Sequence, residues 1–303
     1  KYLLMRDVIK LDSKNEELIF AKNMVLKSKW VNDIIRLQWE DGSWGQFHSM
    51  SQFSQSPITT EQALRRLLIL GLDKNDEVIQ KALLYMEKYL IGELELRDRV
   101  EKKHDWDILT RLFVTTWILK IDPSNDLAKS IAKDWAKIII HAFSKDEYNH
   151  NYYKEAYYEI HRSPKDKYMW RFDNFYIVSI LVGMLPSDIE SKFLDYLINS
   201  KNGIYYVYDK CIKEIPCSFC SKNASRYIDV HNLLCSYSSA KIKLNYFIEW
   251  LNNNKSKDGF WDMGQSVKDK IQFPLSNSWR KTINRKIDCT VRILKILSKL
   301  NVL

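Results

Sequence analysis

The sequence predicts an all-α fold, and three observations lead to this prediction. Only 8 Gly and 6 Pro occur among 303 residues, too few turn residues for the many short strands of an all-β fold. Apolar residues recur at positions i and i+4, the spacing that places side chains on one face of a helix. Two distant segments also repeat one helix-and-turn pattern without a gap. We therefore expect helices throughout the chain.

The repeat begins in its first copy at Trp30 and ends at Trp44, with Ile34, Gln38 and Gly42 between them. The second copy has the same spacing and comprises Phe247, Leu251, Lys255, Gly259 and Trp261. A third copy, with a shorter turn, comprises Phe193, Leu197, Gly203 and Tyr205. A Gly with positive φ ends a helix, so the aromatic residue two positions later can fold back onto that helix. We expect these aromatic residues, Trp44 and Trp261 above all, to be structural.

A second pattern places an acidic residue at the expected start of each following helix. These residues are separated by 66, 56 and 59 positions and are Asp107, Asp173, Asp229 and Asp288. Thr60 occupies the same place in an earlier copy. Because Asp and Thr ahead of an apolar run satisfy free backbone amides and complement the helix dipole, we expect each of them to be the N-cap or a first-turn residue of a helix.

The two patterns together predict two helices per repeat, one that ends in the Gly turn and one that begins at the Asp. About five to six such helical hairpins fit within the chain. If every second helix faces inward, the hairpins close into an α/α toroid around one interior. We expect residues 1–303 to form a single α/α-toroid domain.

Charge and cysteine content limit the partners and the compartment. The 47 Lys and Arg against 38 Asp and Glu give a net charge of +9, which favours an anionic partner. No stretch approaches the roughly 18 consecutive apolar residues of a membrane span, so we expect a soluble protein. The five cysteines, few and odd in number, indicate a reducing cytoplasm.

The segment from Trp30 to Trp44, with Gln38 four residues before Gly42, resembles the QW repeat of squalene and hopene cyclases. The alternation of helices is similar to that of protein prenyltransferase β subunits. In the second copy Lys255 replaces the Gln. The resemblance covers most of the chain as a fold, and it implies a central aromatic-lined cavity that binds an isoprenoid. Because those families add a second helical domain or subunit, it also implies a second helical protein as a partner.

The first candidate site comprises Asp105 and Asp107 with His104 before them. It resembles the Asp-x-Asp-Asp motif by which class II terpene cyclases protonate an alkene or epoxide, which implies that Asp107 is the proton donor. Ile108 replaces the last Asp of that motif and so removes a partner of the acid. Since Asp107 also falls on the repeated helix-start position, helix capping is the alternative and the favoured interpretation.

The second candidate site is a metal site at Asp229 and His231. The pair resembles the Asp and Cys, two residues apart, that hold zinc in protein prenyltransferases, but Val291 stands where the resemblance requires a third ligand. Four cysteines lie in the same region, and the middle two have C-x2-C spacing: Cys211, Cys217, Cys220 and Cys235. Because one such pair lacks a second at standard spacing, we favour reduced thiols over zinc and expect no cofactor.

The third candidate site is a basic and aromatic set near the N-terminal ends of the inner helices. Its members are Arg226, Tyr227, Trp279, Arg280, Lys281 and Arg285. Arginine forks bind diphosphate oxygens in a bidentate manner, so this set would suit a prenyl diphosphate. A solvated charged surface is the equally favoured alternative.

These observations leave two functions open. The first is a terpene cyclase-like or prenyltransferase-like protein that binds an apolar, isoprenoid-type molecule in a central cavity, with or without catalysis. The second is a helical-repeat interaction module that binds an anionic protein or, less favoured, nucleic acid through its positive charge. Salt separates them, because a protein that binds a phosphate backbone loses affinity steeply as salt rises.

Overall fold

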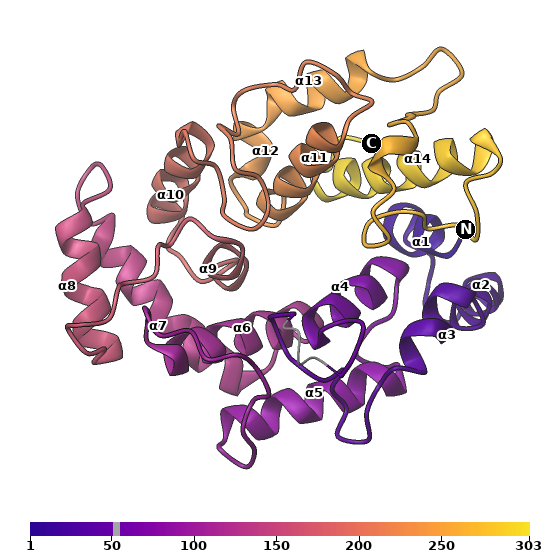
Figure 1. The fold of residues 1–303 in the computed structure, drawn as a ribbon. Coiled ribbons are helices and arrows are strands. Elements are labelled where there is room, and N and C mark those ends of the chain that lie inside the picture. The colour runs from indigo at the N-terminus through magenta and orange to yellow at the C-terminus, as the bar shows by residue number, and fades with distance from the viewer. Residues whose placement is uncertain (51–54) are drawn as a thin grey trace.

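The computed structural model describes residues 1–50 and 55–303, and it confirms the all-α prediction for them (Figure 1). These residues form fourteen α-helices, the short π-helix η1 (Met5–Ile9) and the 3-10 helix η2 (Gln265–Val267), and they contain no β-strand. The α-helices are α1 (Tyr2–Leu4), α2 (Glu16–Leu26), α3 (Lys29–Ile35), α4 (Thr60–Leu70), α5 (Glu77–Leu90), α6 (Trp106–Ile121), α7 (Asp126–Ala142), α8 (His150–His161), α9 (Phe175–Ile180), α10 (Ser187–Asn199), α11 (Lys222–Leu234), α12 (Ala240–Lys243), α13 (Asn245–Asn253) and α14 (Thr282–Lys299). None of the helices described is long and apolar enough to cross a membrane.

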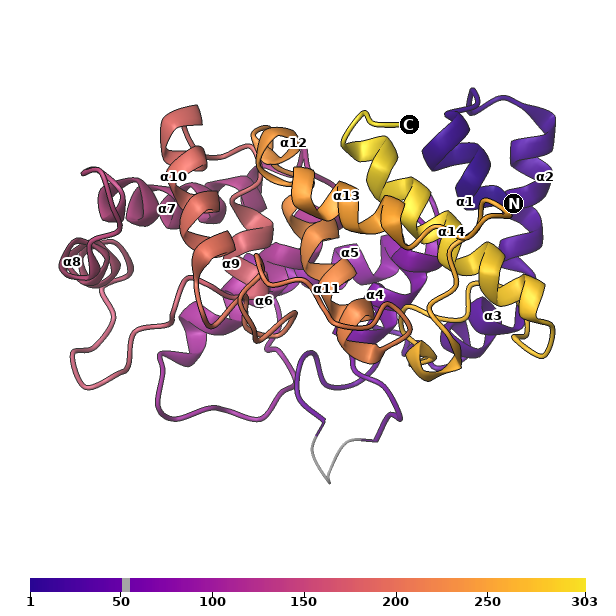
Figure 2. The ribbon, with the colours of Figure 1, turned by 90° about the horizontal axis from the view of Figure 1, so that it is seen from above.

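The two ends of the helical chain lie side by side. Helices α1–α3 start at one end of the molecule, α4–α7 lead to α8 at the opposite end, and α9–α13 return to α14 (Figures 1 and 2). Helix α14 contacts both α1 and η1. The Lys295 ammonium lies 2.8 Å from an Asp7 carboxylate oxygen, and the Ser298 hydroxyl donates to the Asp7 carbonyl oxygen at 3.1 Å. These bonds hold the C-terminal helix against the first segment.

The helices that line the central cavity are separated along the chain by one or two helices that do not line it. Helices α4, α6, α9, α11 and α14 all contribute side chains to one central cavity. Helices α5, α7 and α13 lie outside this set in Figure 1. The cavity wall is therefore built by helices that are interleaved in sequence with helices outside it.

The predicted role of the turn tryptophans is confirmed, because both copies make the same hydrogen bonds. The indole Nε1 of Trp44 donates to the Ile34 carbonyl oxygen at 2.8 Å, and that of Trp261 donates to the Leu251 carbonyl oxygen at 2.7 Å. Each acceptor lies ten residues earlier, in or at the end of the preceding helix. Trp44 is 0% exposed and Trp261 is 2% exposed. The turn thus folds back onto the helix that it ends.

The third copy differs from this prediction. Gly203 does take a positive φ, of 59°, but Tyr205 two residues later remains 43% exposed. Its shorter turn is held by the Ile204 amide, which donates to the Tyr208 carbonyl oxygen at 2.8 Å. Ile204 and Tyr208 are the residues buried there instead.

The expectation that the four repeated Asp residues are N-cap or first-turn residues is confirmed for Asp107, in the first turn of α6, and is wrong for the other three. Two of the helices begin earlier than expected: α11 starts at Lys222, seven residues before Asp229, and α14 starts at Thr282, six residues before Asp288. Both Asp residues are therefore within helices. The Asp288 carboxylate instead accepts from the Leu275 amide at 2.8 Å and fixes the loop ahead of α14.

The two remaining Asp residues stand beside the true caps. Helix α9 is capped by Asn174, which follows Asp173, and α6 is capped by Asp105, whose carboxylate accepts from the Ile108 amide at 3.4 Å. Asp107 lies in the first turn of α6 with its side chain exposed.

This placement predicts different effects for the two acidic residues of α6. Asp105→Ala should lower the free energy of unfolding by about 0.5–2 kcal/mol, as for a lost N-cap. Asp107→Asn should change it by less than about 0.5 kcal/mol, because an exposed side chain is replaced by one of equal size. Urea unfolding of both variants measures this difference. Equal losses in both would contradict the assignment of the cap to Asp105.

Candidate functional site

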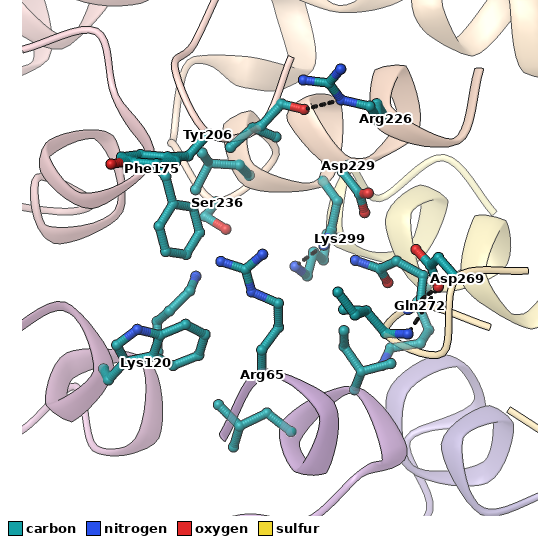
Figure 3. A pocket seen from close by; sticks show the side chains of 18 residues that line it. Arg65, Lys120, Phe175, Tyr206, Arg226, Asp229, Ser236, Asp269, Gln272 and Lys299 are labelled. Carbon is teal, nitrogen blue, oxygen red and sulfur yellow. Dashed lines mark hydrogen bonds between the residues drawn. The ribbon is translucent and has the colours of Figure 1, made fainter. Parts of the chain in front are cut away.

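A cavity of about 430 Å³ lies at the centre of the molecule, between α4, α6, α9, α11 and α14 (Figure 3). Its size is in the range of about 300–1,000 Å³ that accommodates small-molecule ligands. Apolar and aromatic side chains form a large part of its wall, namely Leu68, Ile69, Trp117, Phe175, Leu233 and Ile271. The apolar part of a ligand could be buried against this surface.

Three cationic side chains point toward one another in the cavity: Arg65 from α4, Lys120 from α6 and Lys299 from α14 (Figure 3). The guanidinium of Arg65 lies 5.1 Å from the centroid of the Phe175 ring, and Lys120 Nζ lies 5.1 Å from the same centroid. One aromatic ring thus holds two cations through cation–π contacts. The three positive charges come from three different helices, which fixes their relative positions.

These three cations are incompletely neutralised. Lys120 makes no ion pair or hydrogen bond with any residue that the structure describes, and Lys299 donates to the neutral amide oxygen of Asn232 at 2.9 Å. Arg65 has the Glu61 carboxylate at 3.5 Å, the long end of hydrogen-bond range. The cavity therefore has a positive potential that favours the binding of an anion.

The two carboxylates of the cavity wall are engaged elsewhere. Asp229 pairs with Arg292 of α14 at 2.6 Å. Asp269 accepts from the backbone amides of Ile271 and Gln272 at 2.9 and 2.8 Å. Each carboxylate is thus committed to a partner outside the group of three cations.

The two other cations of the wall have acidic partners of their own. Arg226 lies 3.2 Å from Asp209, and Lys295 forms the ion pair with Asp7 described above. Among these cations, Lys120 and Lys299 have no carboxylate partner within the described residues, and Arg65 has only the long contact to Glu61.

The environment of Lys120 also changes its protonation. Lys120 retains exposed surface, but the protein packed around its amine, together with the nearby positive charges of Lys299 and Arg65, lowers the pKa of Lys120 to about 8. Burial likewise lowers the pKa of Lys299. An ammonium in this position gains stability when an anion binds beside it.

A hydrogen-bonded network centred on Glu61 lies next to Arg65, one turn earlier in α4. The Glu61 carboxylate lies 2.7 Å from Nδ1 of His48 and accepts from the Tyr176 hydroxyl at 2.9 Å. Burial alone would lower the pKa of His48, but its hydrogen bond and proximity to Glu61 raise the pKa on balance. Glu61 is one helical turn from Arg65, so this network fixes the N-terminal turn of α4 beside the cavity.

The structure places the first predicted site outside the cavity. His104 lies in the loop before α6, where its Nδ1 is 2.6 Å from Glu101 and its ring packs edge-on against Trp170. Asp105 is the N-cap of α6, and the Asp107 side chain is exposed. The environment that a strong catalytic acid needs, buried among aromatic residues, is not the environment of Asp107.

Asp229 and His231 do not converge on a common point. Two residues apart on a helix are separated by about 200° around its axis. Accordingly, Asp229 faces the cavity, while His231 packs on the opposite side, 0% exposed and stacked on Phe247 with ring centroids 3.9 Å apart. His231 Nε2 lies 3.1 Å from the Tyr246 hydroxyl. Burial lowers the pKa of His231 to about 3, so its imidazole is neutral.

The third predicted set is also dispersed, and only Arg226 lines the cavity. Tyr227 is buried against Phe247 and Trp250, on the face of α11 turned away from the cavity. The remaining members lie in or beside the start of α14. Trp279 is buried and donates to Asp288 at 2.6 Å, Arg280 and Lys281 are exposed, and Arg285 forms two hydrogen bonds with Asp262 at 2.6 and 2.7 Å.

The cysteines are all free thiols in the structure. Cys217 and Cys220 are exposed, Cys211 is half-buried, and Cys235 is buried. Cys220 Sγ lies 3.2 Å from the Asp262 carbonyl oxygen. Across residues 1–50 and 55–303, no group of three or more His, Cys, Asp or Glu side chains is arranged to hold a metal ion.

Sequence reasoning missed Arg65, Lys120 and Lys299, although a signal was present. Lys120 follows the largely apolar segment from Leu112 to Leu119 and is the one residue of α6 with a cationic side chain that lines the cavity. A cation directly after an apolar segment of an inner helix is the pattern that would have identified Lys120.

No family model matches the chain, and no curated protein or solved structure is significantly similar to it. The assignment of function therefore depends on the residues and geometry of this chain.

Proposed function

We propose that this protein binds an isoprenoid diphosphate, or a closely similar amphiphilic anion, in its central cavity. The observation that carries the proposal is the convergence of Arg65, Lys120 and Lys299 beside apolar walls, with no carboxylate closer than the Glu61 contact of Arg65 among the described residues. Such a ligand has an anionic head and an apolar chain, and the cavity offers a complementary surface for each.

The head and the chain would occupy different parts of the cavity. The guanidinium fork of Arg65 suits bidentate contact with phosphate oxygens, and the two ammonium groups add point charges to the same region. Trp117, Phe175 and Leu233 would pack against the chain. The protein's part in this function is binding and charge neutralisation, and Asp107 has no role in it.

We further propose that the helices form an α/α toroid related to those of squalene and hopene cyclases and of protein prenyltransferase β subunits. Three features support this: the matching hydrogen bonds of Trp44 and Trp261, the contact of α14 with α1, and the supply of cavity residues by helices interleaved with helices outside the cavity. In that relationship the cavity corresponds to the interior of the ring.

Calorimetric titration with farnesyl diphosphate tests the proposed function, with farnesol as the matched ligand that lacks the anion. We expect the diphosphate to bind at least about tenfold more tightly, since one charge-assisted hydrogen bond contributes about 1.5–3 kcal/mol. Lys299→Gln should weaken diphosphate binding by about tenfold and leave farnesol binding unchanged. Lys257→Gln, at an exposed position outside the cavity, is the control variant.

The affinity for the diphosphate should also fall as pH rises through about 8, because Lys120 loses its positive charge there. Equal affinity for farnesol and farnesyl diphosphate would contradict the proposal. Tight binding of nucleic acid that weakens steeply with salt, without binding of farnesyl diphosphate, would favour the interaction-module alternative.

A further inference from the structure

The cavity contains three lysines, and their amines are in different states. Lys295 Nζ lies 2.8 Å from Asp7 and is held as an ion pair. Lys299 Nζ donates to Asn232 at 2.9 Å. Lys120 Nζ has no hydrogen-bond acceptor among the described residues and contacts the face of Phe175. Lys120 is thus the cavity lysine whose nitrogen is free to react.

We propose that Lys120 is a nucleophilic amine that forms an imine with the carbonyl group of an anionic aldehyde or ketone bound in the cavity. Arg65 and Lys299 would bind the anionic group of this compound, so the inference rests on the anion site proposed above. The apolar surface of Trp117 and Phe175 would hold the body of the ligand beside the amine.

The surroundings favour the neutral form of the amine, which is the form that attacks a carbonyl. A lysine becomes nucleophilic near neutral pH when it is placed beside other cations, and the Lys120 amine points toward Arg65 and Lys299 in the cavity. Its pKa of about 8 leaves about a tenth of the amine neutral at pH 7. A lysine with its usual pKa near 10.4 has far less.

The reaction balances without an oxidant or a reductant. The Lys120 nitrogen attacks the carbonyl carbon to form a C–N bond, and the carbonyl oxygen takes up a proton to give a carbinolamine. The C–O bond then breaks, the C=N bond forms, and the oxygen leaves as water with the two protons that the amine has lost. An amine and a carbonyl compound thus give an imine and water.

Reductive trapping of the full chain tests this inference. Pyridoxal 5′-phosphate serves as the probe because it combines an aldehyde, an aromatic ring and a phosphate, and borohydride converts any imine into a stable secondary amine. Peptide mass spectrometry then locates the adduct. We expect Lys120 to be labelled first and to about one group per chain, with a rate that rises with pH through about 8.

Two matched controls separate specific trapping from general lysine chemistry. Pyridoxal, which lacks the phosphate, should label Lys120 at least about tenfold more slowly, since it loses charge-assisted contacts to Arg65 and Lys299. Inorganic diphosphate should slow labelling by the phosphate form. Lys120→Arg keeps the charge but removes the nucleophile and should abolish the specific adduct, and Lys120→Gln provides a second variant if the first does not fold.

Labelling that spreads over lysines outside the cavity without preference for Lys120, or that persists unchanged in Lys120→Arg, would overturn the inference. If farnesyl diphosphate binds but Lys120 resists trapping, the inference fails and the anion site stands. If neither the diphosphate nor the phosphate probe binds, both proposals fail.

Discussion

Replacement of Trp261 by Ala should lower the free energy of unfolding by about 3–5 kcal/mol, the usual cost of truncating a buried Trp. Trp261 is 2% exposed and makes two turn-closing bonds. Its indole donates to Leu251 at 2.7 Å, and its backbone amide donates to the Thr290 hydroxyl at 3.0 Å. The Ala variant keeps the hydrogen bond from the backbone amide to Thr290, but it loses the contacts of the indole ring, whose removal leaves a cavity. Trp44→Ala should have a loss of similar size.

Urea unfolding followed by circular dichroism measures these losses. Trp261→Phe should lie between Ala and the wild type, because it keeps most of the apolar volume and loses only the bond to Leu251. Lys257→Ala, an exposed position in the same turn, should change stability by less than about 0.5 kcal/mol. A Trp261→Ala variant as stable as the wild type would show that the turn does not anchor α13.

Acidification should destabilise the protein through His231. Above pH 6.5 the imidazole is neutral in both the folded and the unfolded chain, so its protonation does not affect stability. Below pH 6.5 the unfolded chain binds a proton that folded His231 accepts only near its lowered pKa of about 3. Stability is therefore present above the unfolded pKa and lost as pH falls, by roughly 3–5 kcal/mol at pH 3 from this group.

The matched variant is His231→Phe, which preserves stacking on Phe247 and removes the titrating group. Tyr246, its other neighbour, is half-buried and can bond to water instead. Between pH 7.5 and 4.5 the wild type should lose roughly 2–3 kcal/mol more stability than this variant. His150→Gln, at an exposed histidine, should follow the wild type. Parallel pH dependence of the wild type and His231→Phe would contradict the burial of a neutral His231.

Local patterns in the sequence predicted the parts of the fold that local interactions determine. The turn that ends in Trp44 or Trp261 is specified within fifteen residues, by helix spacing, a Gly with positive φ and an aromatic residue that reaches back. The same apolar spacing predicted that these segments are helices. The recurrence of the turn was sufficient to predict that helices alternate, because a repeated sequence unit folds in a repeated way.

The candidate site could not be predicted in the same way, because its contacts join distant segments. Arg292 pairs with Asp229, 63 residues away, and Tyr176 reaches His48 across 128 residues. Spacing along the chain contains no information about such partners. The acidic pattern failed for a related reason: Asp229 and Asp288 resemble helix caps in sequence, but their helices begin more than a turn earlier.

Charge was the least predictable feature. In sequence, Arg65 and Lys299 look like the solvated face of an amphipathic helix. Only the arrangement of α4, α6 and α14 around one cavity turns them, with Lys120, into a cluster that faces inward.

A crystal structure of the protein with farnesyl diphosphate tests the central claim most directly. The account predicts density for the diphosphate in the central cavity, with phosphate oxygens within hydrogen-bond distance of Arg65, Lys120 and Lys299 and the chain against Trp117 and Phe175. Density for the ligand at another place, or an empty cavity at saturating ligand, would contradict it.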